Sequence, residues 1–143
     1  MKKNLFALMM AVMAIMAFSL TSCSSGADAK VNEFVKQLNS DTFKEQAVAS
    51  KVFTDTDAKV EGNDLILTFK TIPGLSFKGA DQSVLDTQKA AMIAQFKTAL
   101  GTDKIFREGF EGMKEKGMTF VMKFEDTQGE SVAINITPAE VLD

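Results

Sequence analysis

The 143-residue chain contains no histidine, no tryptophan and no tyrosine, and it contains one cysteine. Zinc sites are built mainly from Cys and His ligands, so the usual zinc ligand sets cannot be assembled. The Ser-His and Cys-His pairs of nucleophilic enzymes are excluded for the same reason. One cysteine also leaves no internal disulfide, so packing alone must stabilise the fold. We therefore predict a protein that is not an enzyme and that uses no metal or other cofactor.

Phenylalanine is the only aromatic residue type in the chain. Trp and Tyr are leading contributors to the binding energy of protein interfaces, and this chain has neither. Ten of the 12 phenylalanines follow residue 22, and most of them lie at spacings that are typical of core positions. Any aromatic contact with a partner must therefore come from phenylalanine.

The N-terminus has the layout of a secretory signal peptide, because two lysines precede an apolar run over 5–18. The following segment, Leu20-Thr21-Ser22-Cys23, resembles the lipobox of bacterial lipoproteins. This resemblance implies that residues 1–22 are removed and that the sulfur of Cys23 receives a diacylglyceryl group. A transmembrane anchor is one alternative, but it needs about 20 apolar residues. The other is an ordinary signal peptide, which would leave an unpaired thiol on a secreted protein.

The predicted lipid anchor indicates the cellular location of the protein. Each buried methylene contributes ~0.8 kcal/mol, so two or three acyl chains make release from the membrane negligible. The residue after the cysteine is Ser24 and not an aspartate. By resemblance to the sorting rules of Gram-negative bacteria, this favours the outer membrane. Residues 23–29 form a short tether without an acidic run, which favours the periplasmic side over the cell surface. The membrane is thus an expected partner, through the lipid on Cys23 alone.

Removal of residues 1–22 takes away two of the 16 basic residues and none of the 19 acidic ones, which leaves a net charge of −5. Nucleic acids and anionic lipid surfaces both select for basic patches on their partners. We therefore expect no nucleic acid partner and no membrane-binding face on the folded domain.

Residues 30–143 are predicted to form a single α+β domain, because a chain of this length suits one core. The predicted elements are a helix from a cap at Asp28 to Leu38 that either continues or restarts over 42–50, strands over 52–60 and 65–72, a helix over 81–100 with Gly101 as its C-cap, a helix after an N-cap at Thr102, strands over 118–124 and 131–136, and a closing turn over 138–142. This helix-hairpin-helix-hairpin order predicts an antiparallel sheet of about four strands with helices packed on one face.

The first hairpin has a predicted register. A two-residue loop at Gly62-Asn63 pairs Glu61 with Asp64 and, further along, Thr56 with Phe69. This register places the apolar side chains of both strands on one face, as a half-buried sheet requires.

Two segments leave alternatives open. Residues 72–80 contain Pro and two Gly and are predicted to be a loop, yet Leu75 and Phe77 in this loop are apolar. These two side chains either fold back as a lid on the core or form an exposed binding patch. Gly109 and Gly112 lie inside the fourth predicted helix, where they either interrupt it or let another backbone approach closely.

Carboxylates are the only candidate chemical groups. Asp55 and Asp57 share one strand face, and Glu125, Asp126 and Glu130 gather at the last turn. Calcium prefers several oxygen ligands of this kind, but an EF-hand loop is absent, so solvated carboxylates are the simpler interpretation. A glycosidase pair, a Ser-Lys nucleophile and a glycine-rich phosphate loop have no supporting motif.

Several features resemble a family of small secreted bacterial lipoproteins whose domain has no assigned function. These features are the strand segment 58–70, a long helix of small and apolar residues, and a closing hairpin over 120–136. They are turns and strand alternation, and they cover about 80 residues. The resemblance implies a fold and a location in the cell envelope, and it brings no catalytic residues.

Two hypotheses for the function remain. The first is a lipid-anchored, non-enzymatic envelope module that binds a protein or has a structural role, with Leu75 and Phe77 as the possible binding patch. The second is a carrier that holds a small apolar ligand in a Phe-lined interior. Loss of partner capture at unchanged stability after substitution of the two residues would favour the first hypothesis, whereas a fully packed interior would exclude the second.

Overall fold

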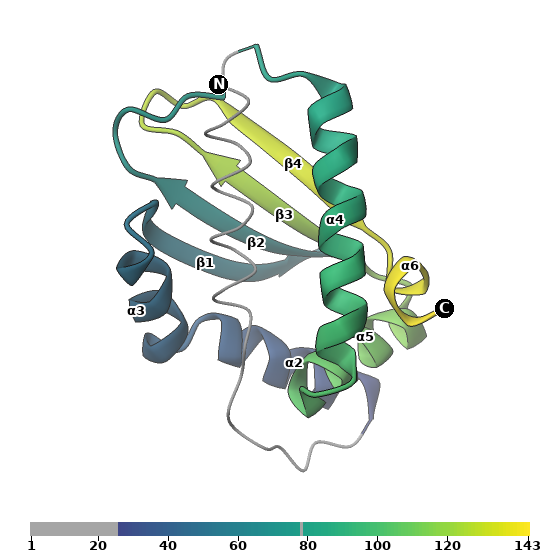
Figure 1. The fold of residues 1–143 in the computed structure, drawn as a ribbon. Helices are drawn as coiled ribbons and strands as arrows, with labels where there is room; N and C mark the ends of the chain where they lie inside the picture. Colours follow the sequence, from purple (N-terminus) through teal and green to yellow (C-terminus); the bar gives the residue numbers. More distant parts are fainter. Residues whose placement is uncertain (1–25, 78) are drawn as a thin grey trace.

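The computed structural model describes residues 26–77 and 79–143. The predicted signal peptide, the lipobox and Cys23 lie outside the described residues. The described elements are α2 (Ala27–Leu38), α3 (Asp41–Ala49), β1 (Phe53–Glu61), β2 (Asp64–Thr71), α4 (Gln82–Leu100), α5 (Lys104–Lys116), β3 (Thr119–Glu125), β4 (Ser131–Ile136) and α6 (Pro138–Leu142). The predicted α+β class is confirmed, and each of two helix pairs is followed by a hairpin (Figure 1).

The four strands form one sheet in the order β1-β2-β3-β4. The two hairpins are antiparallel, but β2 and β3 lie beside each other as parallel strands. The prediction of an antiparallel sheet is therefore wrong at the centre of the sheet, which is mixed. Parallel neighbours require a long crossover connection, and α4 and α5 provide it between Thr71 and Thr119.

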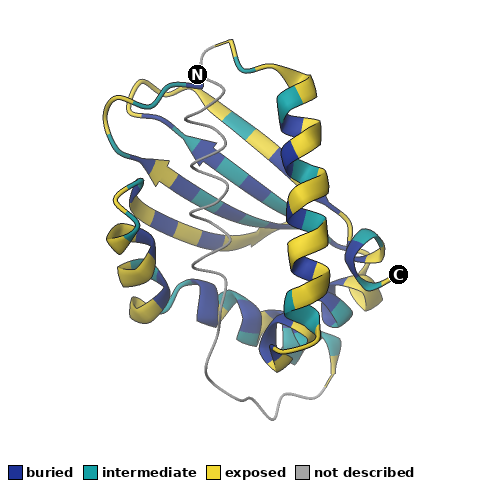
Figure 2. Ribbon diagram, viewed as in Figure 1, coloured by how far each residue is buried: buried dark blue, intermediate teal, exposed yellow. Residues whose placement is uncertain are grey.

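The predicted register of the first hairpin is confirmed, with Glu61 opposite Asp64 and Thr56 opposite Phe69. In the second hairpin, Gly129 has the left-handed backbone (φ 85°) that the turn requires. Buried and more exposed residues alternate along β2 and β3, as they do in a sheet with one covered face (Figure 2).

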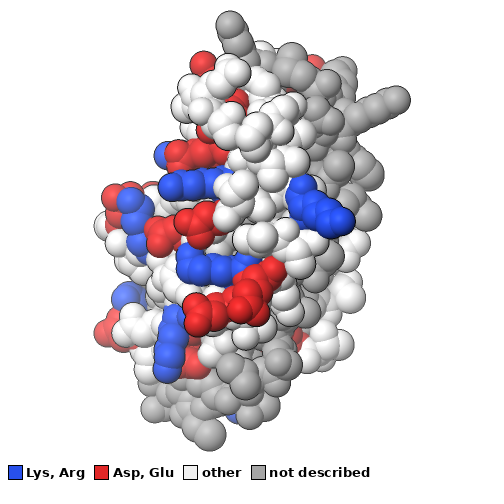
Figure 3. Space-filling model, turned by 90° about the vertical axis from the view of Figure 1, so that its left-hand side faces the viewer, with Lys and Arg blue, Asp and Glu red and all other residues white. Residues whose placement is uncertain are grey.

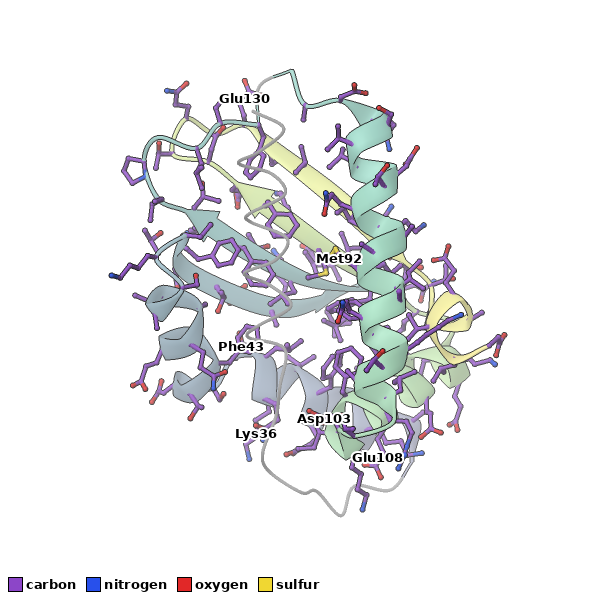
Figure 4. All side chains as sticks on the ribbon, viewed as in Figure 1. Lys36, Phe43, Met92, Asp103, Glu108 and Glu130 are labelled. Carbon is purple, nitrogen blue, oxygen red and sulfur yellow. The ribbon has the colours of Figure 1, made fainter. Side chains whose placement is uncertain are left out.

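The helices cover one face of the sheet, as predicted, and phenylalanines fill the space between. All ten phenylalanines of the described chain are buried. One cluster of contacting rings joins α2, α4 and α5 to β3, and it consists of Phe34, Phe96, Phe106, Phe110 and Phe120. A second cluster joins α3, the strands and the segment after β2, and it consists of Phe43, Phe53, Phe69, Phe77 and Phe124. Met92 points from α4 toward the sheet between them (Figure 4).

Carboxylate caps fix the starts of the two crossover helices. α4 begins after Asp81, one residue later than predicted, and the side chain of Asp81 accepts a backbone N–H of the first turn. Gly101 is its C-cap, as predicted. α5 begins after Asp103, whose carboxylate accepts the N–H of Phe106 at 3.0 Å. The predicted cap at Thr102 is therefore wrong by one residue.

The first helix begins differently from the prediction. Gly26 occupies the N-cap position, and Asp28 lies in the first turn, where it forms an ion pair with Lys116 at 2.6 Å. A negative charge in the first turn is favourable because the helix dipole is positive there. α3 is a separate helix, started by Ser40, whose hydroxyl accepts the N–H of Phe43 at 3.2 Å.

The glycines of α5 allow it to pack tightly against α2. A Cβ atom at Gly109 would lie 2.5 Å from Cγ of Phe34, and one at Gly112 would lie 2.9 Å from the carbonyl oxygen of Ala27. α5 is continuous through both positions. The close approach is therefore the alternative that the structure shows, and the interrupted helix is not.

Candidate functional site

The sheet face opposite the helices carries a hollow of about 400 Å³, which we call the open-face hollow. It lies over β1, β2 and β3 and is lined by charged side chains of both signs. Its charged lining consists of Lys44, Lys59, Lys70, Lys123, Asp55, Asp57, Glu61 and Glu125. Ile66 and Thr68 of β2 also line the hollow. The hollow is thus electrically balanced, in contrast to the acidic chain as a whole.

The register of the sheet produces the alternation of charge. Asp55, Lys70 and Glu125 are direct neighbours across β1, β2 and β3, and the adjacent row places Lys123 beside Thr68. Side chains directly opposite each other have Cβ atoms about 4.5–5.5 Å apart, so neighbouring opposite charges attract each other. Figure 3 shows lysines and acidic side chains interleaved on this side of the molecule.

Two of the lysines in the hollow are engaged and two are not. Lys44 forms an ion pair with Asp55 at 3.4 Å, and Lys59 forms one within its own strand. Within the described ranges, Lys70 and Lys123 form no ion pair within 4.0 Å. These two ammonium groups on adjacent strands are therefore available to carboxylates of a ligand or partner.

The outer edge of β1, next to the hollow, is closed by the first two helices. The side-chain amide of Asn39 donates to the carbonyl oxygen of Ala58 at 2.7 Å and accepts its N–H at 2.8 Å. Lys44 of α3 donates to the carbonyl oxygen of Thr56. These bonds satisfy backbone groups that another strand would otherwise pair with.

The predicted binding patch lies against the core. The ring of Phe77 is 6% exposed and contacts Phe124, with ring centroids 6.4 Å apart. Leu75 is partly buried and packs against the same core. This placement favours the lid over the exposed patch for the segment 72–80.

One carboxylate holds this lid in place. Oδ2 of Asp126, in the β3–β4 turn, accepts the N–H of Phe77 at 3.0 Å, while Oδ1 accepts the N–H groups of Gln128 and Glu130. The bond from Phe77, together with those from the turn, lowers the pKa of Asp126 below its ordinary value of 3.8, against a raising effect of burial. Asp126 therefore stays ionised and joins the turn to the lid.

The other carboxylates singled out in the sequence are distributed over the surface. Asp55, Asp57 and Glu125 line the open-face hollow, whereas Asp126 is buried in the turn and Glu130 is exposed beyond it. In the part of the chain that the structure describes, no group of three or more Asp, Glu, His or Cys residues is arranged to hold a metal ion. Of the three acidic residues near the last turn, Asp126 is the one whose carboxylate accepts the hydrogen bonds of the described turn.

A search of protein-family models, curated proteins and solved structures finds no match to the chain. The resemblance to small secreted lipoproteins therefore stays a prediction. Over residues 26–77 and 79–143, no helix is both long and apolar enough to cross a membrane.

Sequence reasoning found the charged residues of the strands but missed the open-face hollow and the closure of β1. Alternation along β1 and β2 was a usable signal, because it placed Asp55, Asp57, Lys70 and Thr68 on the solvent side. Asn39 gives no comparable signal, since a helix-ending asparagine is common and its partner lies 19 residues away.

Proposed function

We propose that this protein is an exported, lipid-anchored module of the bacterial outer membrane that binds another protein and catalyses no reaction. The open-face hollow is the proposed contact surface. The lipid on Cys23 supplies the membrane attachment, most simply on the periplasmic side. In this proposal the described domain binds its partner through the charged face of the sheet.

The anchor is supported by the sequence. An apolar run preceded by lysines leads directly into Leu20-Thr21-Ser22-Cys23, and Cys23 is the only cysteine. Acylation of this residue also removes the free thiol that a secreted protein would otherwise carry.

The observation that carries the binding proposal is the balanced charge of the open-face hollow. Four lysines and four carboxylates lie on one face of an otherwise acidic domain, and two of the lysines, Lys70 and Lys123, lack ion-pair partners within the described ranges. Charge patterns of this kind select a protein partner with the complementary pattern and set its orientation. Small-molecule sites are instead mostly apolar and enclose the ligand.

Site-specific photo-crosslinking in intact cells tests this proposal. A photo-reactive residue replaces Thr68, near the centre of the open-face hollow, in the full chain. The matched control carries the same residue at Ala91, which is exposed on α4. We expect one discrete crosslinked protein from position 68 and none from position 91. Charge reversal by Lys70→Glu or Lys123→Glu should weaken this product, whereas Lys97→Glu on α4 should not.

Two results would contradict the proposal. The first is the same set of products from positions 68 and 91, because that indicates random collision. The second is a product that persists unchanged in both charge-reversal variants while their melting temperatures match that of the wild type.

The second candidate function is a carrier for a small apolar ligand in the Phe-lined interior, and the contacting phenylalanine rings that fill the space between helices and sheet weigh against it. Native mass spectrometry of the full chain, purified gently from the envelope of its own host, distinguishes this function from protein binding. An additional mass that disappears on denaturation supports the carrier and identifies the ligand by its size. The bare mass of the protein supports the binding module.

A further inference from the structure

The two edge strands of the sheet, β1 and β4, differ in whether side chains of other elements bond to their backbone. The edge of β1 is closed by Asn39 and Lys44, which bond to its backbone. β4 forms the opposite edge of the sheet, on the side where α4 lies (Figure 1). In the described part of the chain, no hydrogen bond joins a helix or loop side chain to the backbone of residues 131–136.

Hydrogen bonding in the last hairpin shows which groups of β4 face outward. The N–H of Asp126 donates to the carbonyl oxygen of Glu130 at 2.9 Å, so these residues form a hydrogen-bonded pair. Such pairs alternate along an antiparallel ladder, and the register then makes the next one Phe124 with Val132. It follows that the N–H and C=O groups of Ser131, Ala133 and Asn135 point away from β3, into the free edge.

The side chains of β4 do not protect this edge. Natural proteins usually protect an edge strand with lysines, prolines, bulges or inward-pointing charges. β4 has the sequence Ser-Val-Ala-Ile-Asn-Ile, without a charge or a proline, and it pairs with β3 without a register shift. Ser131, Ala133 and Asn135 are exposed, small and uncharged.

A second hollow, of about 180 Å³, lies between this strand and α4. Gln82, Leu85, Asp86 and Lys89 line its α4 side, and residues 133–135 line its β4 side. These four helical residues recur at the spacing of a single helix face. The edge is therefore flanked by a helix surface that carries one acidic and one basic side chain.

We propose that the β4 edge is a self-association surface, at which β4 of a second copy pairs antiparallel about a twofold axis through Ala133. This pairing would join the two four-stranded sheets into one continuous sheet. It is independent of the proposed function, because it uses the opposite edge of the sheet from β1 and leaves the open face of β1 and β2 uncovered.

Charge complementarity identifies the occupant as a second copy. In this register Ala133 meets Ala133 and Ser131 meets Asn135, so no like charges oppose each other in the paired strands. A twofold axis brings the same surface of both copies together. The α4 strip beside the strand carries both Asp86 and Lys89, so each copy presents both signs of charge to the other, although the ammonium group of Lys89 also forms an ion pair with Glu140 of its own chain at 3.2 Å.

Disulfide crosslinking of the full chain in membranes of its host tests this pairing. Residues opposite each other in a hydrogen-bonded antiparallel pair have Cα atoms about 5.5 Å apart, which a disulfide can span. We therefore expect Ala133→Cys to give a disulfide-linked homodimer under mild oxidation. The matched control is Val60→Cys, which is exposed on β1 two residues beyond Ala58, whose backbone groups are bonded by Asn39. The wild-type chain, measured in parallel, gives the background from Cys23.

Two further variants test the register and the edge. Copies with Ser131→Cys and copies with Asn135→Cys should crosslink when expressed together and should not crosslink when expressed separately. Adding Asn135→Lys to Ala133→Cys should reduce the homodimer to the level of the Val60→Cys control, because it places a charge in the pairing edge.

Three outcomes would overturn the proposal. One is the absence of a homodimer from both Ala133→Cys and the co-expressed pair. Another is equal crosslinking of Ala133→Cys and Val60→Cys, which indicates collision in the membrane. The third is a crosslink from Ala133→Cys to a different protein, identified by its mass, because this would show that another protein binds the β4 edge.

Discussion

The carboxamide of Asn39 bonds both backbone polar groups of Ala58, with an Nδ2 to carbonyl oxygen distance of 2.7 Å and an Oδ1 to amide nitrogen distance of 2.8 Å. Asn39 ends α2, so one residue both terminates a helix and replaces a neighbouring strand at the edge of β1. The bond pair couples the helical layer to the sheet at the edge where no other strand pairs.

The substitution Asn39→Ala should therefore destabilise the domain. It leaves the N–H and the carbonyl oxygen of Ala58 without their partner, and an unsatisfied polar group that is at least partly buried costs about 1–3 kcal/mol. Asn32→Ala is the matched control, because Asn32 is exposed on α2. Urea titration followed by circular dichroism measures both free energies of unfolding. Equal values for the two variants would show that the Asn39 bonds contribute nothing.

The contact between α2 and α5 should not tolerate a methyl group. Gly109→Ala places Cβ 2.5 Å from the ring of Phe34, and overpacking of this kind costs about 1–3 kcal/mol. This loss should exceed the gain of up to about 1 kcal/mol that alanine brings to a helix interior. Gly101→Ala is the control, since its nearest atom would lie 3.4 Å away. Thermal melting is the measurement, and a Gly109→Ala variant as stable as wild type would contradict the close packing.

Two buried threonines of neighbouring strands should respond in opposite directions to the same substitution. Among residues 26–77 and 79–143, the buried Oγ1 of Thr56 has no hydrogen-bond partner, whereas Oγ1 of Thr71 donates to the carbonyl oxygen of Glu125 at 3.3 Å. Thr56→Val should raise the free energy of unfolding by about 1 kcal/mol, and Thr71→Val should lower it by a similar amount. Chemical denaturation of both variants tests this. A loss of stability in Thr56→Val would show that its hydroxyl has a partner.

The lid over residues 72–80 should loosen in acid. Because the pKa of Asp126 is lowered in the folded protein, its ionised form contributes stability above the unfolded value of 3.8, and this contribution is lost as pH falls through the lower folded pKa. The protection factor of the Phe77 amide, which is the intrinsic exchange rate divided by the observed rate, should therefore fall below about pH 4. Asp126→Asn should show a low protection factor already at neutral pH, with no further decrease in acid. Glu125→Gln is the control and should keep the wild-type profile.

Removal of the Phe77 ring should reduce stability. Phe77→Ser deletes a buried ring in contact with Phe124, and deletion of a buried phenylalanine costs about 3–5 kcal/mol. Leu75→Ser should cost less, because Leu75 is only partly buried. A melting temperature that stays unchanged in Phe77→Ser, together with loss of partner capture, would restore the exposed patch as the correct interpretation.

Local patterns in the sequence predicted the elements well. The turn at Gly62-Asn63 and the alternation of its strands determined the register of β1 and β2, because a shift by one residue would expose every apolar side chain. Gly101 marked the end of α4 through its capping preference, and the apolar period marked its start to within one residue of Asp81. Thr102 was predicted in place of Asp103 because both residue types are favourable caps and only the three-dimensional course of the chain selects one of them.

The relation between the hairpins was beyond the reach of local patterns. A strand with one buried face shows the same alternation of apolar and polar residues beside a parallel or an antiparallel neighbour. The sequence pattern of β2 and β3 therefore does not predict that they pair in parallel. The candidate site depends on this pairing, because it brings Lys123 and Glu125 beside residues of β2. The sequence therefore indicated which side chains of each hairpin face solvent, but it did not indicate that the two hairpins together form the open-face hollow.

The parallel pair at the centre of the sheet also has a consequence for folding kinetics. Leu65 and Phe120 face each other although they are 55 positions apart in the chain. Each hairpin can form within microseconds, but the central pair must wait for closure of a long loop and for the docking of α4 and α5. We therefore expect the folding chain to pass through an early stage with two separate hairpins, whose exposed inner strands are most vulnerable to misassembly before they meet.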